Sequence, residues 1–267
     1  MTDGQGPYGL KPEDSTENTV ASLASRAIAV LASKRFHGRS PASETLILDL
    51  VDAARSGGET ALNQAIAKLS RAGIPNEEII DFYIPEAARR LGDDWCSDGL
   101  GFAEVTIGSA RLQRAVRSLS APPRYADTVG DAERSVLVVV MEDHFHTLGA
   151  MVLAEQLRRL GVSVRLLLGE TERRVLHTVA SGNFDAIFFS VAVVERLAGL
   201  RELVEKTRDV SPDPVPIVVG GAVGHLGTDV RKVTGADHTA TDPREALRLC
   251  GLKVSTPGAS PLRETSR

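Results

Sequence analysis

Apolar residues recur every three or four positions through the first half of the chain, which is the spacing of one face of an α-helix. Glycine and proline residues that stop or start helices interrupt this pattern. The pattern predicts helices at 20–36, 42–55, 59–71, 76–91 and 102–120. Because such helices bury their apolar faces against one another, we expect this half of the chain to form a helical bundle.

The pattern changes in the second half of the chain. Residues 135–141 (SVLVVVM) are apolar without polar alternation, and further short apolar runs follow at 163–168, 186–192 and 217–220. Strands of this kind that alternate with helices are typical of a parallel sheet covered on both faces. We therefore predict a Rossmann-like, doubly wound α/β domain, with helices at 148–160, 172–180, 195–208 and 226–233 and a last strand and helix that end near Leu249.

Polar segments bound these two regions. The first residues are rich in Gly, Pro, Ser and acidic side chains, and a Pro-, Gly- and charge-rich segment lies between the two halves. Such composition is typical of tails and loops. The expected organisation is a flexible tail (1–19), a helical bundle cap (20–120), a linker (121–134), a Rossmann-like domain (135–252) and a second flexible tail (253–267).

Composition and charge narrow the classes of function. No run approaches the roughly 18–20 apolar residues of a membrane-spanning helix, and no secretory signal precedes the first helix, so we expect a cytoplasmic protein without membrane contact. A formal net charge of -4 argues against direct DNA binding, which depends on clustered Lys and Arg. Cys96 and Cys250 have no CxxC spacing and indicate neither a disulfide nor a zinc site. Nothing in the composition indicates an oligomeric state.

Ligands of doubly wound sheets bind at the carboxyl ends of the strands. The first predicted strand runs into MEDHFHTLG (141–149), the third ends near Ser190, and the fourth ends at Gly220 and Gly221. Because parallel strands end at the same edge of a sheet, we expect these three loops to meet at one rim.

Three common functions of this fold do not match the loops. Dinucleotide binding needs GxGxxG after the first strand, where only Gly149 is present. A phospho-acceptor domain needs an aspartate where Ser190 stands. An esterase needs a serine within GxSxG, and Phe189 and Val191 flank Ser190 instead.

The combination of a histidine loop, a serine loop and a glycine pair resembles the cobalamin-binding domain of methionine synthase and its relatives. In that family a DxHxxG loop supplies the histidine that binds cobalt, and SxL and GG loops make room for the buried nucleotide tail. The resemblance implies that His146 is the axial cobalt ligand and that Gly149, Ser190, Gly220 and Gly221 lie beside the cofactor.

Two positions depart from that motif. His144 stands where the family has aspartate, and Ala192 stands where it has leucine. In the family, this aspartate sets the tautomer and basicity of the ligand histidine. In this chain either Asp143 takes over that role, or these properties of His146 are less strictly controlled. This departure argues against a methyl-transfer enzyme. His144 is itself a candidate cofactor contact or ligand, although the motif register favours His146.

A second resemblance lies in the helical half. The segment LGDDW (91–95) is similar to the LGxxW segment of helical caps that cover the upper face of the corrin, which makes Trp95 a candidate cofactor contact; a purely structural role for this large aromatic side chain stays open. The Glu-His pair of methyltransferase caps is absent, and GFAEVTIGSARLQ (101–113) stands there instead. Together with EDHFHTLG (142–149), this stretch resembles the AerR and PpaA regulators of photosynthesis genes in purple bacteria.

This resemblance implies a regulator and not an enzyme. It implies a light-responsive antirepressor that binds adenosylcobalamin or hydroxocobalamin and contacts a repressor of the CrtJ/PpsR type. Two alternatives remain open, namely a corrinoid protein that carries methyl groups and a haem-binding sensor that uses the same histidines on the same fold.

Overall fold

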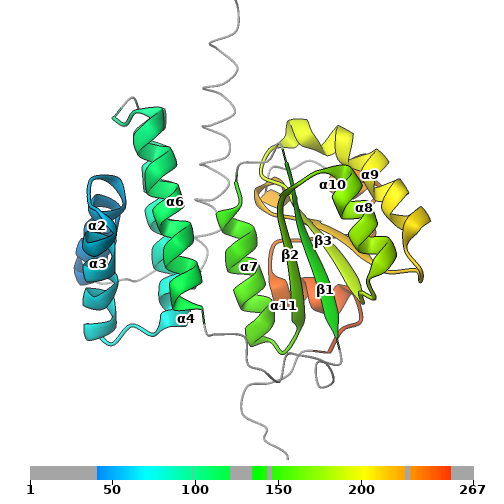
Figure 1. Ribbon diagram of the computed structural model, residues 1–267, viewed down its shortest axis with the longest axis horizontal. Helices are drawn as coiled ribbons and strands as arrows, with labels where there is room; N and C mark the ends of the chain where they lie inside the picture. Colours follow the sequence, from blue (N-terminus) through cyan, green and yellow to red (C-terminus); the bar gives the residue numbers. More distant parts are fainter. Residues whose placement is uncertain (1–40, 98, 121–133, 143–145, 226–228, 254–267) are drawn as a thin grey trace, which may run out of the picture.

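The protein has a helical half and an α/β half (Figure 1). This architecture confirms the fold class predicted from the apolar spacing. Four predicted segments lie outside the described residues, namely the first tail (1–19), the helix at 20–36, linker residues 121–133 and the second tail beyond Lys253. The computed structural model describes residues 41–97, 99–120, 134–142, 146–225 and 229–253.

The helical half forms its own core, in which Leu50, Leu69, Leu91 and Leu112 are fully buried. The segment predicted as one helix at 76–91 is a continuous helical run that extends to Cys96 and contains one π-helical turn. None of the described helices is both long and apolar enough to cross a membrane. The helical elements are α2 (Pro41–Arg55), α3 (Glu59–Arg71), α4 (Asn76–Glu78), η1 (Ile79–Tyr83), α5 (Ile84–Cys96) and α6 (Phe102–Leu119).

Helices α2, α5 and α6 meet at Gly108. A Cβ atom at this position would lie 2.9 Å from Leu91 Cδ1 and 3.5 Å from the Ala54 carbonyl oxygen. The next turn of α6 ties the same helices together, because Arg111 donates hydrogen bonds to the carbonyl oxygens of Ala54 (2.8 Å) and Arg55 (3.1 Å) at the end of α2. A side chain at position 108 would therefore displace the end of the buried Leu91 side chain, and glycine lets these helices pack closely without that shift.

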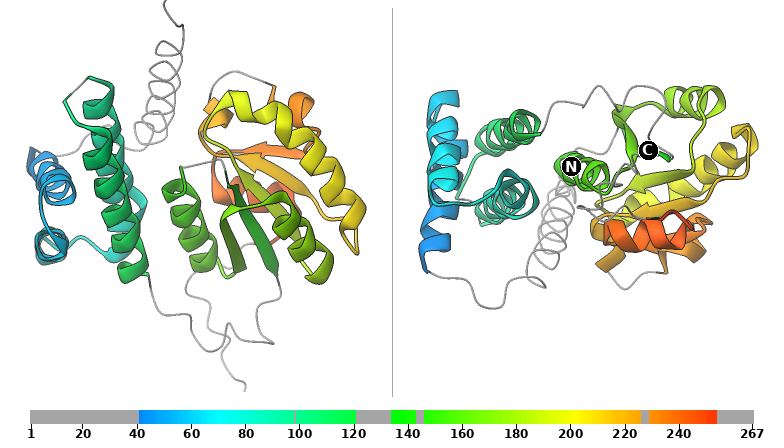
Figure 2. Two further views of the ribbon diagram at one scale, coloured as in Figure 1. Left: turned by 45° about the horizontal axis from the view of Figure 1, so that its top comes forward. Right: turned by 90° about the horizontal axis from the view of Figure 1, so that it is seen from below.

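The α/β half is a parallel sheet in the order β2-β1-β3-β4-β5. Helices α7 and α11 cover one face and α8, α9 and α10 cover the other (Figures 1 and 2). Its elements are β1 (Ser135–Met141), α7 (Leu148–Arg159), β2 (Ser163–Glu170), α8 (Glu172–Ser181), β3 (Ala186–Ser190), η3 (Val194–Arg196), α9 (Leu197–Val210), β4 (Ile217–Gly220), η4 (Ala222–His225), α10 (Val230–Thr234), β5 (His238–Ala240) and α11 (Pro243–Leu249).

Helix α7 joins the two halves. Ala150 and Leu157 belong to the core between α7 and the sheet, whereas Met151 and Val152 belong to the core of the helical half. At the end of α7, Arg159 Nη2 donates to both carboxylate oxygens of Asp81 in η1, at 2.5 and 2.6 Å. The helical half therefore lies against the side of α7 that faces away from the sheet (Figure 2).

Glu86 is a buried carboxylate in the helical half, with only 7% of the residue exposed. It accepts hydrogen bonds from Arg89 Nη2 (2.6 Å) and from Arg90 Nε (3.1 Å). Arg90 also forms a two-point contact with Glu44, at 2.6 and 2.8 Å. Burial raises the pKa of Glu86, but the hydrogen bonds and positive charges of the two arginines outweigh burial and lower this pKa below its usual value.

We predict that Glu86→Gln lowers the free energy of unfolding by roughly 2–4 kcal/mol at pH 7, because two arginines lose their buried carboxylate partner. A lowered pKa in the folded state stabilises the protein above the ordinary carboxyl pKa, and this contribution is lost as the pH falls through the lowered value. Urea denaturation of the parent protein and of Glu86→Gln measures the difference in their free energies of unfolding. This difference should stay constant from pH 7 to about pH 4.5 and become smaller between about pH 4.5 and pH 3.

The matched control for this prediction is Glu44→Gln, which removes the exposed partner of Arg90. Its effect should stay near 1 kcal/mol or below, as is usual for exposed ion pairs. Equal losses in the two variants, or a Glu86→Gln gap that persists unchanged at pH 3, would contradict the account.

Candidate functional site

The carboxyl ends of β1, β3 and β4 form one rim of the sheet (Figure 1). Ser190 is in register with Gly220, and Gly220 is in register with Ala240. Beyond β3 the Val191 N–H donates to the Gly220 carbonyl oxygen at 2.9 Å, so the serine loop and the glycine loop are joined. The parallel order thus brings together the loops that the sequence singles out.

His146 lies in the loop between β1 and α7, two residues before the first residue of α7, and is exposed. Gly149 is the second residue of α7 and is also exposed, and a Cβ atom at this position would lie more than 4 Å from every other described residue that is not its neighbour in the chain or helix. Among the described residues, the space beside the start of α7 is therefore unobstructed. His144 and Asp143, the other candidates in this loop, lie outside the described residues.

Small side chains line the rim on the face that α7 and α11 cover. Phe188 and Ala240 belong to the core on this face, whereas Phe189 belongs to the core on the opposite face. Because side chains alternate along a strand, half-buried Ser190 points to the α7 and α11 face, with Gly220 and Ala240 beside it in register. A serine, a glycine and an alanine place no large side chain in this row, so the residues present fit the nucleotide tail of a cobalamin.

Gly220 and Gly221 are expected to make room for the cofactor, but the structure shows that they also allow neighbouring backbone segments to pack closely. A Cβ atom on Gly220 would lie 2.6 Å from the Ala240 carbonyl oxygen, and one on Gly221 would lie 2.5 Å from the Val191 carbonyl oxygen. Gly221 also has a φ of +95°, which favours glycine. A side chain at either position would collide with neighbouring backbone, so the close packing of the rim already requires both glycines.

Trp95 belongs to the helical half and not to the rim of the sheet. It lies in the last turn of α5, is half-buried, and packs against the core of the helical half. That half is separated from the sheet by α7 (Figure 2). The structure therefore gives Trp95 a packing role, and its predicted contact with the cofactor stays a prediction.

A protein-built metal centre is not found within the part of the chain that the structure describes, since no three His, Cys, Asp or Glu side chains group together there. A bound corrin would supply most of the ligands of its cobalt, so a single protein imidazole would be enough to hold the metal. Imidazole nitrogen is a common ligand for transition metals. The exposed imidazole of His146 at this rim is therefore a suitable ligand for the cobalt of a cobalamin.

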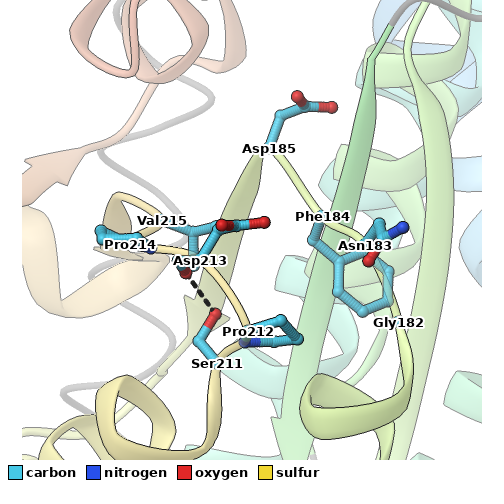
Figure 3. A pocket seen from close by; sticks show the side chains of 9 residues that line it. All are labelled: Gly182, Asn183, Phe184, Asp185, Ser211, Pro212, Asp213, Pro214 and Val215. Atoms are coloured by element: carbon cyan, nitrogen blue, oxygen red, sulfur yellow. Dashed lines mark hydrogen bonds between the residues drawn. The ribbon is translucent and has the colours of Figure 1, made fainter.

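A hollow of about 400 Å³ lies at the opposite edge of the sheet (Figure 3). The loops before β3 and β4 form it, with Phe184 and the carboxylates of Asp185 and Asp213 in its lining. Asp185 accepts a hydrogen bond from the Ser135 N–H at 2.6 Å, at the start of β1. Because ligands of parallel sheets bind at the carboxyl ends of the strands, this hollow is not part of the candidate site.

Comparison with known proteins identifies the class of the α/β half. The family model of the B12 binding domain matches residues 134–254. The structure is similar to that of the monomethylamine corrinoid protein of Methanosarcina barkeri, with a TM-score of 0.59, 17% identity, and coverage of 78% of this chain and 97% of that chain. This likeness concerns the fold. The α/β half is therefore a cobalamin-binding domain.

A curated relative extends the match into the helical half. The uncharacterized 20.5 kDa protein in the bchF-crtJ intergenic region of Rhodobacter capsulatus is 37% identical over 172 residues, which are 64% of this chain and 89% of the relative. The chain belongs to the AerR-type family of cobalamin-binding proteins, which confirms the resemblance drawn from its motifs.

We predict that Gly149→Ala weakens cobalamin binding roughly fivefold or more, because the added methyl group enters the space beside His146 where the cofactor would lie. The unliganded protein should keep or gain stability, since alanine favours a helix by up to about 1 kcal/mol over glycine. Equilibrium dialysis with hydroxocobalamin and thermal denaturation measure the two effects.

Gly199→Ala is the matched control. Gly199 lies in the first turn of α9, is exposed, and would likewise place a Cβ atom with nothing within 4 Å. This variant should gain similar stability and bind cobalamin like the parent protein. Unchanged cobalamin binding in Gly149→Ala would remove Gly149 from the site.

Proposed function

We propose that the protein is a cobalamin-dependent, light-responsive transcriptional regulator that acts as an antirepressor by binding a CrtJ/PpsR-type repressor. The observation that supports this most is the exposed His146 at the rim, directly before the helix that carries the helical half. The match to a relative described by its position between bchF and crtJ supports the regulatory role. On this proposal the protein is not an enzyme.

Each residue of the rim has a role in this proposal. His146 binds cobalt through its imidazole, and Ser190 faces the nucleotide tail along the row of small side chains. Gly149 leaves the corrin side of α7 unobstructed. When bound, the cofactor, as adenosylcobalamin or hydroxocobalamin, would supply a cobalt ligand that light or solution conditions can exchange.

Helix α7 is proposed to transmit a change at the rim to the helical half, and through it to the binding of the repressor. It begins two residues after His146 and ends in the ion pair between Arg159 and Asp81. A shift of the histidine loop therefore acts on a helix that is packed against the helical half. Regulation requires that the two states of the protein bind the repressor with different affinities.

The first test is the absorption spectrum of the purified protein after incubation with hydroxocobalamin, adenosylcobalamin or haemin, followed by gel filtration. We expect retained corrin absorption with a histidine-coordinated spectrum that changes on illumination. His146→Ala should lose this spectrum and retain less cofactor. His177→Ala, which removes an exposed histidine on α8, should match the parent protein.

Each alternative function has a distinct outcome in the same experiments. A corrinoid methyl carrier is favoured by the fold likeness to the monomethylamine corrinoid protein, and it would turn over methyl groups between a donor and an acceptor. A haem sensor would retain haemin with a Soret band and no corrin. An unchanged spectrum in His146→Ala would reject His146 as the ligand.

The regulatory role is tested with a purified CrtJ/PpsR-type repressor bound to its operator DNA. Cobalamin-loaded protein should release the repressor with a half-maximal concentration that differs roughly fivefold or more between dark and light, which is the lower range of typical allosteric couplings. His146→Ala should lose the light dependence, and His177→Ala should keep it. Equal release by loaded and unloaded protein in dark and light would contradict a cobalamin-dependent antirepressor.

A further inference from the structure

Strand β2 carries one residue more than β1 at the rim. Val140 pairs with Leu168 and Met141 pairs with Glu170, so Gly169 has no partner on β1. Gly169 has a φ of +66°, and a Cβ atom at this position would meet nothing within 4 Å. Backbone conformation and not crowding therefore requires a glycine here, as in a β-bulge whose extra residue is left-handed.

The bulge sets the point at which the histidine loop is held. The Glu142 N–H, the first after β1, donates to the Glu170 carbonyl oxygen at 3.1 Å. In a regular parallel ladder that continued the pairing of Val140 with Leu168, the acceptor would be the carbonyl of residue 169. The extra residue thus moves the anchor of the loop by one residue along β2, and His146 follows four residues later.

We infer that the bulge at Gly169 is a positioning device for the cobalt-binding loop, which fixes where the His146 imidazole leaves the rim. This inference rests on the proposed role of His146 as the ligand. Bulges are frequent beside functional sites, where they redirect the end of a strand. Gly169 acts on the cofactor only through the backbone of the loop, so it is a positioning residue.

A simpler role for the bulge is to end the edge strand without any effect on the ligand, and the two roles differ in where backbone strain acts. A β-branched residue at position 169 is disfavoured at positive φ. Suppose that the cofactor binds only to the bulged conformation and that the free variant relaxes to a regular ladder. Binding must then restore the strained bulge, and this cost lowers the affinity of the variant for the cofactor. If the bulge only ends the strand, strain affects free and bound protein equally and leaves affinity unchanged.

The test uses three variants of the full chain, loaded with hydroxocobalamin. Gly169→Val should bind the cofactor roughly fivefold more weakly, which corresponds to about 1 kcal/mol of left-handed strain, and should show a reduced histidine-coordinated spectrum at saturation. Gly169→Asn should restore affinity and spectrum, because asparagine tolerates the left-handed region.

Gly251→Val is the matched control. Gly251 has a φ of +71°, is exposed, and also has nothing within 4 Å of its Cβ position. It lies at the opposite end of the sheet, next to Lys253, whose carbonyl oxygen accepts from Arg134 just before β1. This variant should lose similar thermal stability and keep the parent affinity and spectrum.

The outcomes separate the inference from the proposed function. Parent-like affinity and spectrum in Gly169→Val, with stability lost as in Gly251→Val, would overturn the positioning role and leave the ligand assignment intact. A parent protein whose spectrum does not differ from that of His146→Ala would show that the ligand assignment fails, and the inference would fail with it.

Discussion

Helix α7 must be apolar on two sides, and the arrangement of the molecule depends on this double burial. Ala150 and Leu157 close the core over the sheet, while Met151 and Val152 complete the core of the helical half. Burial of apolar surface on both sides stabilises one relative placement of the two halves. Because the helix starts directly after the histidine loop, the proposed function requires this packing to transmit a shift of the loop to the helical half.

Most elements of the fold follow from apolar spacing alone. The first strand and the helix at 59–71 have the bounds that the pattern predicts. Two features escape it, namely the π-helical turn η1 and the bulge at Gly169. Each inserts a single residue into a regular element, and such an insertion depends on tertiary packing that apolar spacing does not encode. The bulge also accounts for one of the two residues by which β2 extends beyond the predicted end at Leu168, to Glu170.

The candidate site was predictable in its location but not in its geometry. The rule that parallel strands bind ligands at their carboxyl ends, together with the motif resemblance, is sufficient to select His146, Ser190 and the glycine pair. The direction of Ser190 needs the register of β3 and β4. The close approach of Gly221 to the Val191 carbonyl is likewise a contact between segments that are distant in the sequence. The motif therefore suggests a role for this glycine in cofactor binding, and only the structure shows that packing also requires it.

Whether the imidazole of His146 binds cobalt can be observed by electron paramagnetic resonance. The protein is prepared with histidine labelled with nitrogen-15 in the ring, loaded with cobalamin and reduced to the paramagnetic cobalt(II) state. In this state the unpaired electron couples to the nucleus of the lower axial nitrogen. We expect that triplet splittings of the unlabelled protein become doublets in the labelled protein, and that His146→Ala abolishes the change. Triplets in both preparations would show that the benzimidazole of the cofactor is the ligand and that His146 is not.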